Sequence, residues 1–328
     1  MLDLRLIPAG AVTRFAPSPT GYLHLGHVAN AVWTWGVAGA VGARVILRIE
    51  DHDRGRCRPE YETAILEDLA WLGLVPDEVS AGSLSGHPSA YRQSDNSDRY
   101  RAAVTRLSQL TPVYACECSR QAIVSTLGED APGGGEEARY PGTCRETNLA
   151  FESRRGIRAI LPEEPISFAD LRLGTISQTP ARQCGDLLLN DSTGNWTYQL
   201  SVVVDDLAQG VDLVVRGEDL LDSTGRQILL GRLLGRSTQP LFLHHPLIRD
   251  DRGEKLSKRA GAKSLRALRD EGLTSEGALG LAAWSTGLAP TADPLTPDAL
   301  ADLCVGVGGS PPSRGGGLPP APTWVEAQ

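Results

Sequence analysis

The chain begins with a change from apolar to chain-breaking residues that predicts a strand, a turn and a helix. An apolar run ends at Val12, and residues 17–21 contain prolines and a glycine that interrupt any regular element. Residues 23–42 are dominated by Ala, Val, Leu and Trp, which is typical of a buried helix. His24 and His27 therefore lie where this helix is expected to begin.

Further strand-like runs follow this helix and recur in the second half of the chain. Residues 42–53 form a β-branched run that leads into acids, and residues 195–221 contain two strand-like runs with a connector. Because such runs alternate with helical segments, we expect an α/β fold with a doubly wound parallel sheet. Ligands of this fold bind beyond the carboxyl ends of the strands. The polar residues expected there are Glu50, Asp205, Asp206, Arg216 and Glu218.

The expected helix start has the features of a phosphate site. Backbone N–H groups at a helix N-terminus attract anions, Gly26 allows close approach to the backbone, and imidazoles donate to phosphate oxygens. His24 and His27 are three residues apart and share one helical face. The alternative is that both are ordinary, partly exposed histidines. A distant basic segment, EKLSKR at 254–259, is by itself typical of a solvated surface.

Three of the six cysteines lie close together in the sequence and indicate a metal site. Cys116 and Cys118 are separated by one residue, and Tyr140 precedes Cys144 by four positions. Three thiolates and a fourth donor complete a tetrahedral zinc site, and the Tyr140 phenolate is the nearest oxygen. Its ordinary pKa of about 10 would have to be lowered by the metal. The alternative is three buried free cysteines beside a packing tyrosine.

Composition and charge limit the classes of function. The chain has 328 residues, 41% of them hydrophobic, and a net charge of −8, which allows about two domains and argues against a histone-like polyanion binder. Neither a membrane-length apolar run nor a secretory signal pattern is present, so we expect a cytoplasmic protein. A local basic surface fits RNA contact or, alternatively, an ion-paired helix. Its candidate members are Arg252, Lys255, Lys258, Arg259, Lys263, Arg266 and Arg269.

Two distant segments together resemble one family. TRFAPSPTGYLHLGH, at 13–27, resembles the nucleotide-binding signature of class I aminoacyl-tRNA synthetases in the form found in their glutamate and glutamine branch. KLSKR resembles the second signature of this class, a loop whose second lysine contacts ATP phosphates. The resemblance implies activation of glutamate by ATP and magnesium, with catalysis by His24, His27 and Lys258. The implied ATP site comprises His24, Gly26, His27, Lys255, Leu256, Ser257, Lys258 and Arg259.

The charged residues near the strand ends match the needs of a glutamate substrate. Two carboxylates and one ammonium group require two cationic donors and an acid, and arginine binds carboxylates bidentately. By resemblance, Arg14 with Tyr198 contacts the side-chain carboxylate, Arg216 contacts the α-carboxylate, and Glu50 with Ser18 contacts the ammonium group. The alternative for each charged residue is a surface salt bridge. The implied set is Arg14, Phe15, Ala16, Pro17, Ser18, Glu50, Tyr198 and Arg216.

The resemblance also predicts an architecture. The cysteine pattern resembles a zinc module of many bacterial glutamate-activating synthetases, which implies one structural zinc ion on Cys116, Cys118, Tyr140 and Cys144. We expect a catalytic domain in two halves, an inserted zinc-bearing subdomain, a short helical region and a Pro/Gly-rich disordered tail. The expected boundaries are 1–85 and 190–245 for the halves, 86–189 for the subdomain, 246–288 for the lysine loop and helical region, and 289–328 for the tail.

The length after the basic segment bears on the acceptor. Only 69 residues follow Arg259, which is too few for a further anticodon-binding domain of about 100 residues. The chain therefore resembles the truncated branch of the family that transfers glutamate to the queuosine base of tRNA(Asp), and we expect a monomer. The alternatives are a truncated glutamyl-tRNA synthetase that charges the 3′ end of tRNA(Glu), a general nucleotidyltransferase, and a non-catalytic RNA-binding module.

Overall fold

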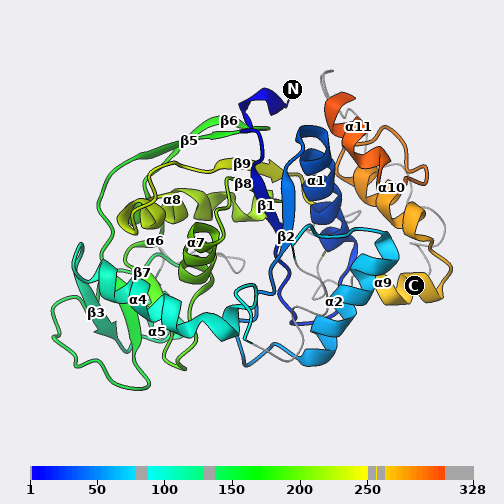
Figure 1. Cartoon of the computed structure of the whole chain (residues 1–328). Coiled ribbons are helices and arrows are strands. Elements are labelled where there is room, and N and C mark those ends of the chain that lie inside the picture. The colour runs from blue at the N-terminus through cyan, green and yellow to red at the C-terminus, as the bar shows by residue number, and fades with distance from the viewer. Residues whose placement is uncertain (1, 79–87, 129–136, 250–255, 257–262, 307–328) are drawn as a thin grey trace.

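A computed structural model describes residues 2–78, 88–128, 137–249, 256 and 263–306 (Figure 1). The strands are β1 (Val12–Phe15), β2 (Arg44–Leu47), β3 (Val113–Cys116), β4 (Gly156–Ala159), β5 (Ile166–Asp170), β6 (Gly174–Gln178), β7 (Leu187–Asn190), β8 (Leu213–Gly217) and β9 (Leu241–His245). The helices are α1 (Leu25–Val41), α2 (Pro59–Leu72), α4 (Ser97–Leu107), α5 (Arg120–Leu127), α6 (Pro180–Cys184), α7 (Tyr198–Ala208), α8 (Thr224–Leu233), α9 (Leu265–Asp270), α10 (Ser275–Ser285) and α11 (Ala299–Gly306).

The central strands are mostly parallel. β1 pairs with β2, and both β8 and β5 pair with β9, in parallel, whereas β6 pairs with β5 in antiparallel. β1 and β8 lie side by side, and the backbone N–H of Asp212 donates to the carbonyl oxygen of Val12 over 2.9 Å. The expected α/β class with a parallel sheet is therefore confirmed, and β6 adds an antiparallel edge strand to it.

The region predicted as an inserted subdomain, residues 86–189, contributes to two sheets. Its strands β5 and β6 extend the central sheet beyond β9. β3, β4 and β7 form a separate antiparallel sheet. The central sheet is thus completed by strands from the middle of the chain, which the sequence alone did not indicate.

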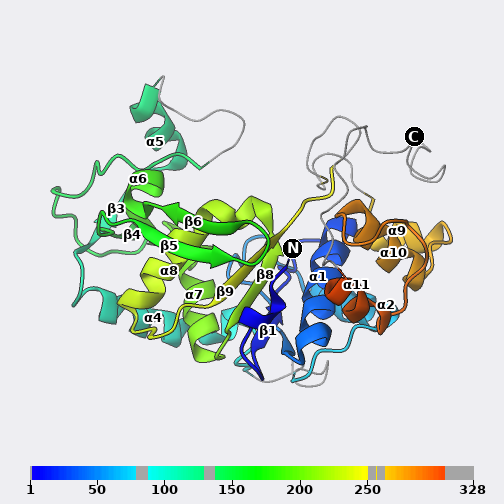
Figure 2. The same ribbon diagram turned by 90° about the horizontal axis from the view of Figure 1, so that it is seen from above.

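Helices gather on two sides of the central strands (Figures 1 and 2). α1 packs against β1 and β8, with α10 and α11 against its outer side, and α2 contacts α10. On the other side α7 contacts α8 and α4. Buried side chains form one cluster around α1 and a second around α7, α8 and β9. In the part of the chain that the structure describes, every helix is too short or too polar to cross a membrane.

α1 confirms the helix expected over residues 23–42 and is buried on several sides. Its Gly36 faces α11, where an added Cβ atom would lie 2.9 Å from both the carbonyl oxygen of Leu300 and the Sγ atom of Cys304. These contacts are too close for any side chain, so the glycine allows the two helices to approach. The far end of the chain therefore helps to hold the helix that begins beside His24.

The prediction of a disordered tail from residue 289 is wrong for residues 289–306. This segment includes α11, whose Leu300 and Cys304 are buried. Its prolines and glycines flank a short apolar stretch, and burial of this stretch against α1 offsets the conformational entropy that is lost when it becomes ordered. The composition of the whole tail does not reveal this stretch. Residues 307–328 lie outside the described residues.

One of the two strand-like runs in residues 195–221 is a helix. Val202, Val203 and Val204 suggested a strand, but they lie in the middle of α7. The apolar residues at 200, 203, 204 and 207 have the i, i+3, i+4, i+7 spacing of a helix, and the consecutive valines obscured it. Burial of this segment outweighs the modest helix penalty of β-branched residues. The second run is the strand β8, as expected.

Candidate active site

A cavity of about 360 Å³ opens at the carboxyl ends of β1 and β8, beside the start of α1. Its wall contains every residue of the predicted glutamate and ATP sites that lies among the described residues. These are Arg14, Phe15, Ala16, Pro17, Ser18, His24, Gly26, His27, Glu50, Tyr198, Arg216 and Leu256. The predicted residues Lys255, Ser257, Lys258 and Arg259 lie outside the described residues. The structure thus brings together residues that are more than 200 positions apart in the chain.

The two histidines form the N-terminal cap of α1. The Nδ1 atom of His24 accepts the backbone N–H of Gly26, and the Nδ1 atom of His27 accepts the backbone N–H of His24, each over 3.1 Å. In a neutral imidazole the proton then resides on Nε2, which becomes a hydrogen-bond donor. The cap therefore fixes the orientation of both rings and gives each a donor on the side away from the backbone.

A residue without a side chain is needed at position 26 for a second reason, which the sequence did not indicate. A Cβ atom at this position would lie 2.8 Å from Cε1 and 3.0 Å from Nδ1 of His24. The absence of a side chain makes room for the imidazole of His24 against the first turn of α1. The glycine thus serves the histidine as well as any nucleotide that approaches the backbone.

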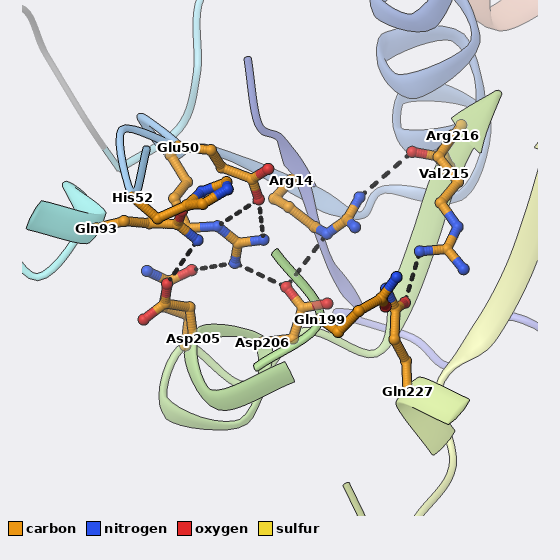
Figure 3. Close-up of polar contacts among 12 residues, drawn as sticks. Arg14, Glu50, His52, Gln93, Gln199, Asp205, Asp206, Val215, Arg216 and Gln227 are labelled. Carbon is orange, nitrogen blue, oxygen red and sulfur yellow. Dashed lines mark hydrogen bonds and ion pairs between the residues drawn. The ribbon is translucent and has the colours of Figure 1, made fainter. Parts of the chain in front are cut away.

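Arg14, on β1, is held by a buried ion network (Figure 3). Its Nε donates to Oδ1 of Asp206 over 3.2 Å, and its Nη1 donates to the carbonyl oxygen of Val215 over 3.3 Å. Burial alone would raise the pKa of Asp206, but Arg14 and Arg48 together hold it below its ordinary value. Asp206 is therefore an ionised partner that fixes the arginine.

Arg48 connects this pair to Glu50, and the sequence reasoning missed it. Its side chain is fully buried, and its Nη1 donates over 2.7 Å to the same Oδ1 of Asp206 that Arg14 contacts. Its Nη2 donates to Oε1 of Glu50 over 3.0 Å. The signal was available, because Arg48 is a lone charge inside an apolar strand-like run, where a charge must find buried partners.

Arg216, at the end of β8, is a buried cation with neutral partners. Its Nε donates to Nε2 of His244 over 3.0 Å, its Nη1 to Gln227 over 2.6 Å, and its Nη2 to Thr224 over 2.8 Å. Figure 3 shows the contact with Gln227. Among the described residues no carboxylate forms an ion pair with Arg216. Its environment lowers the pKa of Arg216, chiefly through burial, so this cation favours an anionic ligand.

Tyr198, the first residue of α7, faces the same charges. Burial is the main cause that raises its pKa, while Arg216 and Arg14 act in the opposite direction and Glu50 acts in the same one. The hydroxyl therefore remains protonated at neutral pH and is able to donate as well as accept a hydrogen bond. Tyr198 lines the same cavity as Arg14 and Arg216.

Asp205 and Glu218, both expected near strand ends, have structural partners away from the cavity wall. Asp205 accepts from Gln93, Arg99 and the Tyr100 hydroxyl, at 2.7–3.0 Å. Glu218 accepts from Nη2 of Arg172 over 2.7 Å. The expected strand end was wrong for Asp205 and Asp206, which lie in α7 because the valines before them are helical. It was correct for Glu50, just after β2, and for Arg216 and Glu218, at the end of β8.

Comparison with known proteins decides the family. The sequence model of "tRNA synthetases class I (E and Q), catalytic domain" matches residues 11–283. The chain belongs to this class I tRNA synthetase family. A relative from Symbiobacterium thermophilum, described as "Glutamyl-Q tRNA(Asp) synthetase", is 42% identical over 298 residues, which cover 88% of this chain and 90% of the relative. A relative of the same description from Nitratidesulfovibrio vulgaris is 40% identical, with 87% and 89% covered.

A solved structure of the same family agrees with the fold. The crystal structure of a glutamate tRNA ligase from Elizabethkingia meningosepticum, determined in complex with its amino acid, matches with a TM-score of 0.71 and 28% identity. The match covers 89% of this chain and 64% of that protein. The chain therefore spans somewhat less than two thirds of this solved relative, and the shared part contains the α/β core described above.

The four predicted zinc-site residues also converge in this family member. The Sγ atoms of Cys116, Cys118 and Cys144 all lie within 4.8 Å of one another. The Tyr140 hydroxyl oxygen lies 3.4 Å from Sγ of Cys116 and 3.8 Å from Sγ of Cys118, and it accepts the backbone N–H of Cys144 over 2.9 Å. Donors about 2.3 Å from a shared zinc ion lie at similar separations. The donor set fits zinc.

A cation lies against this cluster, whereas burial opposes ionisation of Tyr140 and Cys118. Arg158, a buried residue of β4, donates from Nε to Sγ of Cys116 over 3.3 Å, and its guanidinium carbon lies 3.7 Å from the centre of the Tyr140 ring. Burial raises the pKa of Tyr140, and it raises the pKa of Cys118 to about 11. The tyrosine and this thiol are thus protonated in the absence of a metal, and an ion that binds them must displace protons.

The described members of the basic surface form ion pairs. Lys263 contacts Glu271 over 2.8 Å, Arg269 contacts Asp68 over 3.4 Å, and Arg266 pairs with Glu67. These pairs agree with the alternative of an ion-paired helical surface. The remaining candidates, Arg252, Lys255, Lys258 and Arg259, lie outside the described residues.

Proposed function

We propose that this protein activates L-glutamate with ATP to form glutamyl-adenylate, without RNA, and transfers the glutamate to the queuosine base at the wobble position of tRNA(Asp). The observation that carries the proposal is one cavity that combines two buried arginines, a buried glutamate and the histidine-capped start of a helix. The relatives described as glutamyl-Q tRNA(Asp) synthetases, at 40–42% identity over most of both chains, support the same substrate and acceptor.

The charges of the pocket favour glutamate over glutamine. Among the described residues, the buried charged groups of the pocket wall and their direct ion partners are three arginines and two carboxylates, a net charge of +1, while Asp219 on the same wall is exposed. They are Arg14, Arg48, Arg216, Glu50 and Asp206. Glutamate, with a net charge of −1, makes the set neutral, whereas glutamine leaves a buried cation without an anion. Asp170 lies beyond the imidazole of His244 and is already satisfied by it and by backbone N–H groups.

Each end of the substrate then has a partner. Arg14 with Tyr198 binds the side-chain carboxylate. Arg216 binds the α-carboxylate, which supplies the anion that its neutral protein partners do not. Glu50 with Ser18 binds the ammonium group. The buried contacts that hold Arg14, Glu50 and Arg216 support these roles, because a preorganised arginine loses little entropy when it binds a carboxylate.

The ATP phosphates lie at the start of α1 in this proposal. An oxygen of the α-carboxylate attacks the α-phosphorus of ATP, the bond between this phosphorus and the α,β-bridging oxygen breaks, and pyrophosphate leaves. His24 and His27 donate from Nε2 to phosphate oxygens, and Lys258 neutralises charge from the second signature. Bound magnesium would supply further neutralisation of the phosphates. No protein nucleophile is needed.

The zinc site has a structural role in this proposal. Cys116, Cys118, Tyr140 and Cys144 would hold one ion and so connect β3 with the segment that follows residue 137. A structural zinc ion contributes many kcal/mol to small modules of this kind. Arg158 offsets part of the negative charge of the thiolates and the phenolate. None of these residues lines the cavity that contains Arg14 and Arg216.

A second candidate differs only in the acceptor. The similarity to a solved glutamate tRNA ligase favours a protein that charges the 3′ end of tRNA(Glu). Both candidates share glutamate activation, so the acceptor is the step that separates them.

The test has two stages. Glutamate-dependent exchange of pyrophosphate into ATP is first measured without RNA, with glutamine and aspartate as controls. Transfer of labelled glutamate is then measured to queuosine-containing tRNA(Asp), queuosine-free tRNA(Asp) and tRNA(Glu). Under the proposal, glutamate supports exchange whereas glutamine and aspartate do not, and glutamate is transferred only to queuosine-containing tRNA(Asp). Transfer to tRNA(Glu) would support the second candidate. Transfer to tRNA(Asp) that survives removal of queuosine would exclude the queuosine acceptor.

A further inference from the structure

Asp170 and His244 form a buried pair behind the pocket that the proposed function does not yet use. His244 lies on β9 and Asp170 ends β5, the strand next to it, and both side chains are fully buried. Oδ2 of Asp170 lies 2.7 Å from Nδ1 of His244 and also accepts the backbone N–H of His244 over 3.0 Å. The other oxygen, Oδ1, accepts the backbone N–H groups of Arg172 and Leu173. The carboxylate is therefore fixed by four contacts.

These contacts determine which nitrogen of His244 carries the proton. An ionised carboxylate is only an acceptor, so Nδ1 must donate to Asp170 and Nε2 is left with a lone pair. Nε2 lies 3.0 Å from Nε of Arg216, whose N–H requires an acceptor. The Thr224 hydroxyl lies 3.1 Å from the same Nε2 and also accepts from Arg216 over 2.8 Å. The imidazole thus presents an acceptor to the arginine because Asp170 sets its tautomer.

We infer that Asp170 and His244 are positioning residues that hold Arg216 ready for the α-carboxylate of the substrate. The inference rests on the proposed function, because it assumes that Arg216 binds glutamate. Nothing in it requires either residue to touch the substrate. An imidazole with the proton on Nε2 would place one N–H against another and would displace the guanidinium.

A purely structural role predicts something different. The ring of His244 stacks on Phe242, with ring centres 6.0 Å apart and an interplanar angle of 9°, so a packing role would depend only on shape and volume. A positioning role depends on which end of the side chain carries the acceptor. Two substitutions of similar polarity separate the roles, because a glutamine amide reaches the place of Nε2 whereas an asparagine amide reaches only the place of Nδ1.

The experiment compares His244→Gln with His244→Asn in glutamate-dependent pyrophosphate exchange without RNA. We expect His244→Gln to keep the KM for glutamate within about fivefold of the wild-type value, because its amide oxygen accepts from Arg216. His244→Asn removes a hydrogen bond to a charged group and should raise this KM about 10- to 100-fold. The KM for ATP should change less than about threefold in both variants, since Arg216 does not contact ATP in the proposed function.

Asp170→Asn provides a second test that does not alter the ring. Its amide donates to Nδ1, which moves the proton of His244 to Nε2, so the KM for glutamate should rise as in His244→Asn. Thermal unfolding of all three variants is measured beside the kinetics, because loss of a buried hydrogen bond also destabilises the fold. If His244→Asn does not fold, the comparison of Asp170→Asn with His244→Gln replaces it.

Equal KM values for glutamate in the glutamine and asparagine variants, whether raised or unchanged, would overturn the inference. A rise in the KM for ATP of the same size would do so too, since it would indicate a general distortion. Failure of the proposed function is recognised separately, because wild-type protein would then show no glutamate-dependent exchange.

Discussion

The glutamate pocket gathers residues from distant parts of the chain, whereas the cysteine cluster comes from one short segment, and the two are held in different ways. In the pocket, Arg14, Arg48 and Arg216 each donate hydrogen bonds at 2.6–3.3 Å to protein acceptors. In the cluster, the contacts among Cys116, Cys118, Cys144 and Tyr140 are mainly S–H···O and S–H···S contacts of 3.4–3.8 Å. Such contacts are weak.

This difference separates a preorganised site from one that an ion completes. Charged hydrogen bonds between buried groups hold the pocket in shape before any substrate arrives, which lowers the cost of binding. The cysteine cluster offers donors at suitable separations but few strong bonds among them. We therefore expect changes in the pocket to act on glutamate binding and stability, and changes in the cluster to act on metal content.

The largest expected effect on glutamate activation is that of Arg216→Lys. Lysine keeps the charge but loses the planar fork and the three contacts that fix it, and the loss of a hydrogen bond to a charged group costs about 1.5–3 kcal/mol. We expect kcat/KM for glutamate in pyrophosphate exchange to fall by about 30-fold or more. The matched control is Arg182→Lys, whose side chain is 74% exposed and pairs with an exposed glutamate. A normal KM for glutamate in Arg216→Lys would contradict the proposed role.

Arg48→Met tests the network that supports the pocket. It leaves Glu50 and Asp206 as buried carboxylates that have lost a shared cation, which should cost about 3–5 kcal/mol of unfolding free energy. Urea unfolding at neutral pH measures this difference. Arg101→Met, at a 65% exposed arginine, is the matched control and should change stability by less than about 1 kcal/mol. Equal stability of the two variants would show that the network does not hold the pocket.

Cys144→Ser should affect the cluster and spare the pocket. A serine hydroxyl is a poor zinc ligand, so we expect zinc to bind at least about 100-fold more weakly, as measured by competition with a chromogenic chelator. The kcat/KM for glutamate without RNA should stay within about threefold, because the two regions share no residues. Cys304→Ser, at the contact between α1 and α11, should retain stoichiometric zinc. Full zinc content in Cys144→Ser would exclude this site.

A decrease in pH from about 7.5 to about 6 should weaken zinc binding to the cluster and change the KM for glutamate only slightly. Burial lowers the pKa of His245 to about 4, so this ring stays neutral over the interval, and Asp206 stays ionised because its pKa is lowered. Zinc must instead displace protons from its thiol ligands, so zinc affinity should decrease by about tenfold per pH unit for each proton displaced. A larger change in the KM for glutamate than in zinc affinity would contradict this contrast.

The sequence predicted the residues of the pocket better than the contacts that hold them. His24, His27 and Gly26 stand in one local motif, and the other pocket residues follow from the family resemblance, so their convergence could be anticipated. The pair of Asp170 and His244 could not, because it depends on the parallel pairing of β5 with β9 across more than 70 residues of chain. No local pattern reports that pairing.

Errors in the predicted fold have a related cause. The valines of α7 and the apolar residues of α11 were judged by local composition, whereas burial against neighbouring elements determined their structure. The cysteine cluster was predictable for the opposite reason, since metal ligands must be close in space and their spacing in the sequence reflects this. Local rules are thus most reliable where a ligand imposes the geometry.

The single oxygen of Asp206 that accepts from both Arg14 and Arg48 has a consequence for substrate length. Because Arg48 also holds Glu50, this atom fixes the spacing between the group that would bind the ammonium end and the group that would bind the far carboxylate. The pocket therefore selects substrates by the distance between their ammonium group and their far carboxylate. Aspartate, one methylene shorter, would reach only one of the two binding groups, and its rejection requires no additional residue.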